Sequence, residues 1–600
     1  MATSSSTSSP VLRLAFYTAA IALALIHVFV TFRGISSTEG MTHAQLARTL
    51  AREGVWQTRV IQPYALAQME KNGRQPNVMA MPETTQAPVQ PFVWSLAFRV
   101  FSAQSDYKPN AGGSPVYFYD RVIACFGVLW WLLTIYLTHG AARKLFDDKV
   151  AAIIAIGLLV CQPAWNLAVS GSSRMLLTAE FALAFRLYVS IALRGTEGRS
   201  TGATLFLLGC VCAAMVLTHW LAIWLVIGLF AGVAVFLPAE RKKAALVAIP
   251  PLAALAGWGW WQSMLCGEAM GGVKALFQSQ FAAMPHDLVL RDYSPVLSSI
   301  IVDDLLRRLG LNIEEQSGQF YAHCGGVVLA VFFFVALLHR FRRTEAAAAR
   351  WTVGTVLLCA VLGMGLVGLP QKALDDYSIY TALMPAMGVF GAAMLVILWS
   401  RMMSGSTFWA RWGGPLIALL ICAIPMSVNL PVFLKFGLTL GSKMPPHWPP
   451  YVPERIAVMK QYLDEGEYLY SDAPHFIAWY TNIPCVALPV QREDFAVMKT
   501  KADERKAALA GFVMTPVSAQ CERFSDVFTG NWGEWRDLIV RGPMLAFDKN
   551  FQPDESFPYR VFHPLVVLPV GSNEHLSLPM AFYAEKTRQL RLPTELEQTR

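Results

Sequence analysis

Glu39 and His43 stand four residues apart in the stretch from Ser37 to Arg48, so a helix there would carry both side chains on one face. A carboxylate in that place can accept a proton as a general base, and an imidazole beside it can orient the carboxylate or help to bind a metal ion. A simpler alternative stays open, in which Glu39 is an acid that stabilises a helix N-terminus and His43 is an ordinary surface histidine.

Two further ionisable residues occur in or beside apolar runs, where such groups are costly and often functional. Glu180 follows Arg174 by six residues, which is off one helical face, so the two side chains need not pair. If a span begins near Arg174, Glu180 lies about 9 Å deep and needs a partner or a water-filled cavity. His219 falls in a short break between two apolar runs. Glu180 and His219 are both open to a structural or a functional interpretation.

The composition decides the class of protein that must position these residues. The 600 residues are 54% hydrophobic and only 15% charged, with a mean hydropathy of +0.41, whereas soluble domains carry about 25% charged residues. The formal net charge of +8 is spread between long apolar runs, where basic residues report membrane orientation rather than nucleic-acid binding. The chain also has no Walker loop, Gly-x-Ser-x-Gly elbow, His-Glu-x-x-His or Cys-x-x-Cys motif. The sequence therefore predicts an α-helical polytopic membrane protein that contacts membrane lipids and no nucleic acid.

Runs of about 17–22 apolar residues can cross a bilayer as helices, and we expect about eleven of them. They lie at 11–32, 119–139, 148–166, 175–193, 202–218, 220–237, 244–263, 323–339, 351–369, 379–400 and 414–436. The two runs that meet at His219 could instead form one long span. With the N-terminus inside, every inner connection is basic, as the positive-inside rule requires. We expect a cytoplasmic N-terminus and a periplasmic C-terminus in a bacterial inner membrane.

This layout divides the chain into a disordered N-terminal tail, a membrane domain and a C-terminal domain, with bounds at 1–10, 11–436 and 437–600. The first outer loop, 33–118, is expected to form helices that lie along the membrane interface, because its apolar residues recur at helical spacing. Beyond residue 453, strand-like and helix-like runs alternate, which predicts a small α/β domain on the outer face.

Four cysteines lie in the predicted outer pieces. Cys485 could pair with Cys521, and Cys266 with Cys324, because the outer face of such a membrane is oxidising. Free buried thiols are the alternative for all four.

The first outer loop resembles that of the GT-C class of membrane glycosyltransferases, in the branch of protein O-mannosyltransferases and lipid A aminoarabinose transferases. That family shows an Asp-Glu pair, an aromatic residue, a Ser/Ala-Arg pair and a Gly-Asp/Val-Trp element. Placed without gaps, the pattern puts the catalytic aspartate at Glu39, its partner acid at Gly40, the aromatic residue at His43 and the arginine at Arg48. Gly54-Val55-Trp56 matches the element that follows.

The resemblance continues at lower specificity along most of the chain. Leu217-Thr218-His219 is similar to the family's Leu-Thr-Lys between two spans, and Tyr119-Asp120-Arg121 is similar to the opening of its second span. The sequence departs from the pattern at Gln86-Ala87-Pro88-Val89, where the family has Lys-Pro-Pro-Leu, so the phosphate-contacting lysine is missing there.

The resemblance implies transfer of a sugar from a polyprenyl-phosphate donor to a lipid, glycan or protein acceptor on the outer face. It implies an inverting single displacement with Glu39 as general base. No cofactor is expected, and a divalent metal is not supported by a clear cluster of ligands. The residues that could bind the donor are His43, Arg59, Lys71, Arg74, Arg174, Glu180, His219 and Lys372.

Two alternative functions are compatible with the same sequence. A relative that has lost activity and serves as a scaffold for envelope assembly would explain Gly40 and the missing lysine. A lipid or glycan transporter would need broken spans in matching halves, and Pro250-Pro251 offers one such break without a counterpart.

Overall fold

The structure is a computed structural model of the chain. It describes residues 10–32, 34–101, 116–278, 286–294, 302–323, 328–367, 378–403, 408–438, 453–515, 518, 532–541, 559–561 and 580–584.

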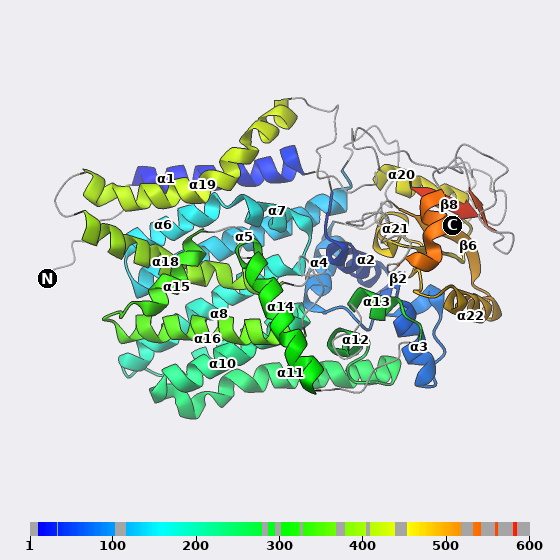
Figure 1. Cartoon of the computed structure of the whole chain (residues 1–600), viewed down its shortest axis with the longest axis horizontal. Helices are drawn as coiled ribbons and strands as arrows, with labels where there is room; N and C mark the ends of the chain where they lie inside the picture. The colour runs from blue at the N-terminus through cyan, green and yellow to red at the C-terminus, as the bar shows by residue number, and fades with distance from the viewer. Residues whose placement is uncertain are drawn as a thin grey trace.

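Apolar helices that run roughly side by side form one end of the molecule, on the left of Figure 1. They are α1 (Pro10–Leu25) continued by η1 (Ile26–Thr31), α5 (Phe118–Leu145), α6 (Asp148–Leu159), α7 (Gln162–Ser170), α8 (Ser173–Thr196), α9 (Gly202–Thr218), α10 (Ile223–Phe236), α11 (Ala245–Cys266), α15 (Val328–Leu338), α16 (Thr344–Leu366), α18 (Tyr380–Met402) and α19 (Phe408–Leu438).

Six helical segments of the described chain are long and apolar enough to cross a membrane, and a seventh counts if α6 and α7, which meet at 59°, form one broken span. Four shorter apolar helices lie at Gly202–Thr218, Trp220–Phe236, Leu329–Leu338 and Gly413–Ile424. All of these segments coincide with apolar runs of the sequence. The number of spans, eleven, stays a prediction.

The bundle is packed around α18, in which every residue from Tyr380 to Leu395 is buried. Small side chains permit this. A Cβ on Gly391 would lie 1.7 Å from the carbonyl oxygen of Leu329 in α15, so the two backbones are in direct contact. By contrast, few residues of α1 and α11 are buried, as in helices at the edge of a bundle in lipid.

The described part of the first outer loop forms three α-helices, the short 3₁₀ helix η2 (Val78–Ala80) and three short strands: α2 (Thr38–Arg52), β1 (Gln57–Thr58), β2 (Val60–Ile61), α3 (Pro63–Lys71), β3 (Met81–Pro82) and α4 (Val89–Val100). The prediction that its helices lie along the membrane interface is wrong for α2, in which every residue from Gly40 to Thr49 is buried. The physical reason is that α4 and α21 (Pro474–Thr481) pack against α2 and cover it. Helix α4 keeps an exposed apolar face at Phe92, Leu96 and Val100, as an interfacial helix would.

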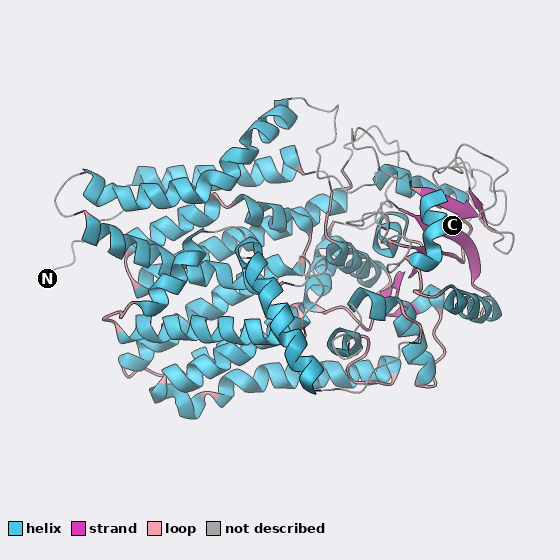
Figure 2. Ribbon diagram, in the orientation of Figure 1, coloured by secondary structure: helices cyan, strands magenta, loops and turns pink. Residues whose placement is uncertain are grey.

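The other end of the molecule carries a six-stranded sheet, drawn as magenta arrows in Figure 2. The strands follow the order β2–β5–β4–β6–β8–β7, with β4 (Glu467–Ser471), β5 (Cys485–Ala487), β6 (Ala508–Met514), β7 (Arg560–Val561) and β8 (Ala581–Ala584). Strands β2, β5, β4 and β6 are parallel, and α21 and α22 (Arg492–Glu504) form the crossover connections between the last three.

The edge strand β2 comes from the first outer loop, with Val60 opposite Cys485. A C-terminal domain of 437–600 alone therefore misses one strand of its own sheet. Two residues are too few to give a strand signal in the sequence.

Further contacts join the outer pieces. Arg291, at the end of α13 (His286–Arg291), donates from Nε to the carbonyl oxygen of Leu488, 2.7 Å away. Glu70 of α3 forms an ion pair with Lys501 of α22. The chain between α11 and α15, in which α13 lies, also contains α12 (Val273–Gln278) and α14 (Val302–His323). Helix α14 crosses the bundle obliquely in Figure 1.

The cysteines that the sequence paired are not bridged where the structure describes them. Cys266 and Cys485 are free, buried thiols, while Cys324 and Cys521 lie outside the described residues. Cys266 Sγ donates to the backbone oxygen of Gln262, 3.2 Å away. The free-thiol alternative therefore holds for Cys266 and Cys485.

Candidate active site

Helix α2 begins with a side-chain cap that sets the direction of Glu39. The Ser37 hydroxyl accepts a hydrogen bond from the backbone N–H of Gly40 over 3.2 Å, as N-cap serines do. The backbone N–H of Ser37 donates to the carbonyl oxygen of Ser170, so the helix start is fixed to the end of α7. Glu39 therefore lies in the first turn of α2, next to the start of α8.

A close approach of two glycines holds α2 in this position. A Cβ on Gly40 would lie 2.7 Å from the carbonyl oxygen of Gly171, and Gly171 itself has φ = 85°, a left-handed conformation that favours glycine. The position where the related family has its second acid therefore has no room for a side chain. The partner acid that the family has at the position of Gly40 therefore has no counterpart here, because the backbone of Gly171 fills the place.

The carboxylate of Glu39 is held by the first residues of α8. Its Oε2 accepts hydrogen bonds from Ser172 Oγ over 3.0 Å and from the backbone N–H of Ser173 over 3.3 Å, and its Oε1 accepts from Ser173 Oγ. A carboxylate has about four acceptor sites, so these three bonds orient Glu39 and leave about one site for another donor. Glu39 is an acid at a helix N-terminus, as one interpretation of the sequence has it: it lies in the first turn of α2, and its hydrogen bonds go to the start of α8.

Glu39 forms part of the wall of a small cavity with a volume of about 50 Å³, room for a few water molecules. The residues that line it come from five segments of the chain: Glu39, His43, Thr85, Gln86, Ala87, Thr218, His219, Trp220, Gly272, Val273 and Leu290. The structure thus places Glu39, His43 and His219, three of the predicted site residues, in the wall of one cavity.

Both histidines of the cavity are buried, His43 to 1% exposure and His219 to 5%. Burial lowers the pKa of His43 to about 4, and the Gln86 side chain offsets only part of that effect. Burial also lowers the pKa of His219 to about 4, and the negative charge of Glu39 offsets this only in part. Both imidazoles are therefore neutral at pH 7, when each can donate one hydrogen bond and accept another.

Polar groups around the cavity are incompletely paired. Neither ring nitrogen of His43 makes a hydrogen bond of ordinary geometry. Glu180 Oε1 accepts from Thr218 Oγ1 over 2.8 Å, but its other oxygen is buried without a hydrogen-bond partner. Because buried polar groups are normally paired, these free positions indicate a site that accommodates a ligand or water.

The predicted cations differ in their distance from this cavity. Arg174 lies beside it: its Nε donates to Ser172 Oγ over 3.1 Å, and its charge acts on His219. Lys71 and Arg74 are exposed, and neither lines the cavity. Lys372 lies outside the described residues.

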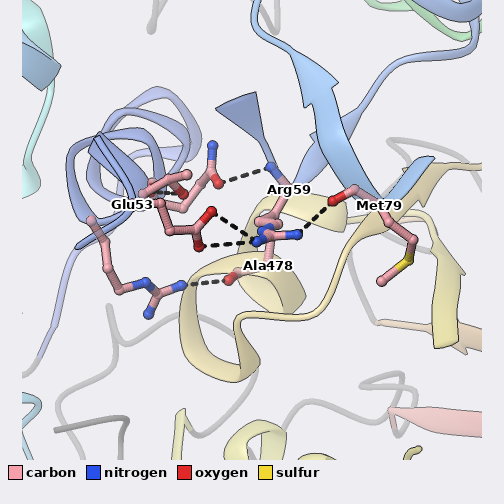
Figure 3. Close-up of polar contacts among 7 residues, drawn as sticks. Glu53, Arg59, Met79 and Ala478 are labelled. Carbon is pink, nitrogen blue, oxygen red and sulfur yellow. Dashed lines mark hydrogen bonds and ion pairs between the residues drawn. The ribbon is translucent and has the colours of Figure 1, made fainter. Parts of the chain in front are cut away.

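Arg59 is committed to a structural role in the first outer loop. Figure 3 shows its guanidinium between the Glu53 carboxylate, 3.1 Å away, and the carbonyl oxygen of Met79, 2.8 Å away. Its backbone N–H donates to the Gln45 side chain of α2. These bonds fix the turn after α2, and Arg59 does not line the cavity.

Arg48 and Asp120, which the family pattern singled out, bind α21. Arg48 donates to the carbonyl oxygens of Trp479 and Ala478 over 2.7 and 2.9 Å, and its guanidinium lies 4.6 Å from the Trp479 ring centre. Asp120, at the start of α5, accepts from Trp479 Nε1 and from the Tyr480 hydroxyl. Both side chains therefore join the C-terminal segment to the helices.

Glu83 was missed by the sequence reasoning. Its buried carboxylate accepts from the backbone N–H and the hydroxyl of Thr85, both at 2.6 Å, and from the backbone N–H of Gln86. Burial raises the pKa of Glu83, and these hydrogen bonds oppose the rise. The turn that results carries Thr85 and Gln86 to the cavity wall. Thr84 and Thr85 directly after an acid are a turn signal that could have indicated it.

The described residues contain no group of three or more His, Cys, Asp or Glu side chains placed to hold a metal ion. A metal site thus finds no more support in the described parts of the chain than it does in the sequence.

The fold is similar to that of solved GT-C membrane glycosyltransferases, the class that the first outer loop resembles. The chain is similar to the crystal structure of ArnT from Cupriavidus metallidurans bound to undecaprenyl phosphate, with a TM-score of 0.54 and 14% identity over 98% of this chain and 100% of that one. For the apo structure of the same ArnT, the TM-score is 0.50 over 84% of this chain and 93% of that one, again at 14% identity.

The archaeal oligosaccharyltransferase AglB from Archaeoglobus fulgidus, in complex with an inhibitory peptide and a dolichol-phosphate, gives a TM-score of 0.49 at 13% identity. That comparison covers 88% of this chain and 73% of AglB. No protein-family model and no curated protein matches the sequence. The likeness to ArnT therefore concerns the fold alone. This fold and the apolar helices indicate an integral membrane protein.

Proposed function

We propose that this protein transfers a sugar from a polyprenyl-phosphate donor to an acceptor on the outer face of the membrane, with Glu39 as the general base. One observation carries the proposal. In a chain with the fold of an ArnT bound to undecaprenyl phosphate, an oriented carboxylate with a free acceptor site lies in the wall of a cavity.

The chemistry is an inverting single displacement. The acceptor hydroxyl attacks the anomeric carbon of the sugar and gives its proton to the free oxygen site of Glu39. The new bond joins that carbon to the acceptor oxygen, and the bond to the phosphate oxygen breaks with its electron pair. A base that is already oriented by Ser172 and Ser173 needs little reorganisation during this step.

The leaving phosphate needs donors that take up its negative charge. The geometry favours Arg174 and His219 for this role, since Arg174 lies next to Ser172 and His219 lines the cavity. Arg59 is held by Glu53 and Met79, so we no longer assign it to the phosphate. His43 and the Thr218–Glu180 pair lie where the sugar or the acceptor would contact the wall.

The orientation follows from the same proposal. A cavity that serves a periplasmic reaction requires a cytoplasmic N-terminus, a bacterial inner membrane and a C-terminal domain, 437–600, on the outer face. The acceptor is a lipid, a glycan or a protein hydroxyl, all of which present an oxygen nucleophile to Glu39.

The test compares Glu39→Gln with the parent in cells from which the native gene is deleted. The readout is the amount of each undecaprenyl-phosphate-linked sugar in the membranes, measured by mass spectrometry. The active parent should consume one of these donors and release undecaprenyl phosphate. Because glutamine cannot accept the proton, the rate of consumption should fall by a factor on the order of 10²–10⁴ at equal protein level.

Two variants complete the design. Glu39→Asp keeps a carboxylate and should retain more activity than Glu39→Gln. Glu53→Gln removes an exposed acid from the end of the same helix and should behave like the parent. If no donor changes with the parent, or if Glu39→Gln is fully active, the transferase proposal or the role of Glu39 is wrong. A scaffold for envelope assembly would then be favoured when all three variants still rescue the deletion phenotype.

A further inference from the structure

A second polar feature lies at the other end of α8, where two helices face each other with matching stripes. Each stripe repeats every four residues, so its side chains share one helical face. The α5 stripe consists of Tyr136, Gly140 and Lys144, and the α8 stripe of Arg186, Ser190 and Arg194.

Arg186 fits closely against α5. Its guanidinium carbon lies 5.2 Å from the ring centre of Tyr136, and a Cβ on Gly140 would lie 3.1 Å from the same carbon. The absent side chain of Gly140 therefore makes the space that the guanidinium occupies. Contact with the face of an aromatic ring compensates a cation only in part.

Two further cations lie nearer the ends of α5 and α8. Lys144 Nζ donates to Ser190 Oγ over 2.9 Å, and a guanidinium nitrogen of Arg194 donates to Thr204 Oγ1 over 3.0 Å. Both cations are exposed and both bind neutral hydroxyls.

In the described part of the chain, no acidic side chain pairs with Lys144, Arg186 or Arg194. Asp148, the acid beside them, is already bound to Arg143 over 2.6 Å. The positive charges of Arg186 and Arg194 also act on Lys144 and repel it. Three cations thus lie near one another along α8 without an acidic partner, which costs free energy unless an anion joins them.

The position of Arg186 makes that cost larger. At 1.5 Å per residue, Arg186 lies about 20 Å along α8 from Ser173 and about 15 Å from Thr196. It therefore sits within an apolar helix, well away from the Glu39 cavity. A charged side chain at such a depth is normally paired or marks a function. On the outside of the bundle, α5 presents three exposed apolar side chains: Leu129 at 53% exposure, Leu133 at 36% and Tyr136 at 62%.

We propose that the seam where α5 and α8 meet binds an anionic membrane phospholipid, with the headgroup phosphate at Lys144 and Arg186 and the acyl chains along Leu129, Leu133 and Tyr136. Arg194 adds charge at the rim. This site is separate from the Glu39 cavity and does not depend on the transferase proposal. Basic pockets between membrane helices are known to select acidic headgroups in this way.

The test uses the full-length protein in nanodiscs made from equal amounts of phosphatidylglycerol and phosphatidylcholine. The ratio of the two lipids that remain bound after extraction is measured by native mass spectrometry. The parent should retain phosphatidylglycerol preferentially. Lys144→Gln/Arg194→Gln removes two exposed charges and leaves Arg186 in place, so the fold is preserved, and the preference should fall on the order of 10- to 30-fold.

The matched control is Arg241→Gln/Lys242→Gln, which removes the same charge from exposed positions of η4 (Pro238–Lys243). These positions lie on the same side of the bundle but outside the seam of α5 and α8. It should keep the preference of the parent. Arg186→Gln should reduce the preference further if it folds. An equal loss in the control variant, an unchanged preference in Lys144→Gln/Arg194→Gln, or displacement of the lipid by millimolar inorganic phosphate would overturn the proposal.

Discussion

The buried polar groups at the two ends of helix α2 differ in whether they have hydrogen-bond partners. At the C-terminal end, Arg48 donates to two backbone carbonyls, and Asp120 beside it accepts from two side chains. At the N-terminal end, His43 has no hydrogen bond of ordinary geometry, and the nearby Glu180 has one oxygen without a partner. Both ends are buried and both hold residues that a family pattern would mark as functional.

Whether a buried polar group has a hydrogen-bond partner distinguishes a structural role from a functional one better than its residue type does. A buried polar group without a partner costs about 1–3 kcal/mol, so a fold tolerates such groups where another molecule supplies the partner. Paired groups such as Arg48 stabilise the contact with α21 and have little capacity left for a substrate. The comparison assigns a structural role to the C-terminal end of α2 and supports the proposal of chemistry at its N-terminal end.

The largest loss of stability should come from Arg48→Met. The substitution leaves the carbonyl oxygens of Trp479 and Ala478 without their donors and removes the contact with the indole ring, so we expect a destabilisation of about 2–5 kcal/mol. The shift of the unfolding midpoint in detergent measures it. Activity per folded molecule should be unchanged, and a large drop in that quantity would place Arg48 in the reaction after all.

The pH dependence of stability tests the other end. His43 and His219 have folded pKa values of about 4 against 6.5 unfolded, so the unfolded chain binds more protons between these values. Their contribution is fully present above pH 6.5 and is lost as the pH falls toward 4, at up to roughly 2 kcal/mol per pH unit. Unfolding midpoints measured from pH 7.5 to 4.5 should follow this slope. His43→Gln/His219→Gln should flatten it, and an equally steep slope in that variant would refute the assignment.

A smaller effect is expected for Gly40→Ala. The new Cβ would meet the carbonyl oxygen of Gly171 at 2.7 Å, and overpacking of this kind costs about 1–3 kcal/mol. Because Glu39 is the neighbouring residue, its carboxylate should move and activity should fall as well. Gly202→Ala is the matched control, since nothing lies within 4 Å of its Cβ position and its φ is ordinary. Equal behaviour of the two variants would show that the contact with Gly171 is not required.

The smallest effect should follow from Glu53→Gln. Glu53 pairs with Arg59 over 3.1 Å but is 40% exposed, and exposed ion pairs contribute about 0–1 kcal/mol. The unfolding midpoint should stay close to that of the parent, and the small difference should shrink further at high salt. A drop in the unfolding midpoint as large as that of Arg48→Met would show that the exposed ion pair of Arg59 stabilises the protein as much as the buried hydrogen bonds of Arg48 do.

Local patterns predicted the parts of this molecule that depend on local physics. The apolar runs coincide with helices, and the spacing of Glu39 and His43 indicated that they share a face. The family resemblance added His219. The sequence could not show that α4 and α21 bury α2, because those contacts join residues that are far apart in the chain.

The same limit explains the errors at Gly40 and Arg59. Gly40 was read as a lost acid, but the reason for a glycine is the backbone of Gly171, more than a hundred residues away. Arg59 has the charge that a phosphate needs, and only its bonds to Glu53 and Met79 reveal another role. A residue type states what a side chain can do, whereas its partners decide what it does.

The edge strand β2 has a consequence for the order in which this protein is made. Val60 pairs with Cys485, which the ribosome adds more than 400 residues later. At about 5–20 residues per second, the first outer loop waits tens of seconds for its partner strand. During that time the segment after α2 has no β5 to pair with, and α2 lacks the cover of α21. A chain that is released early therefore lacks both the strand that pairs with β2 and the helix that covers α2.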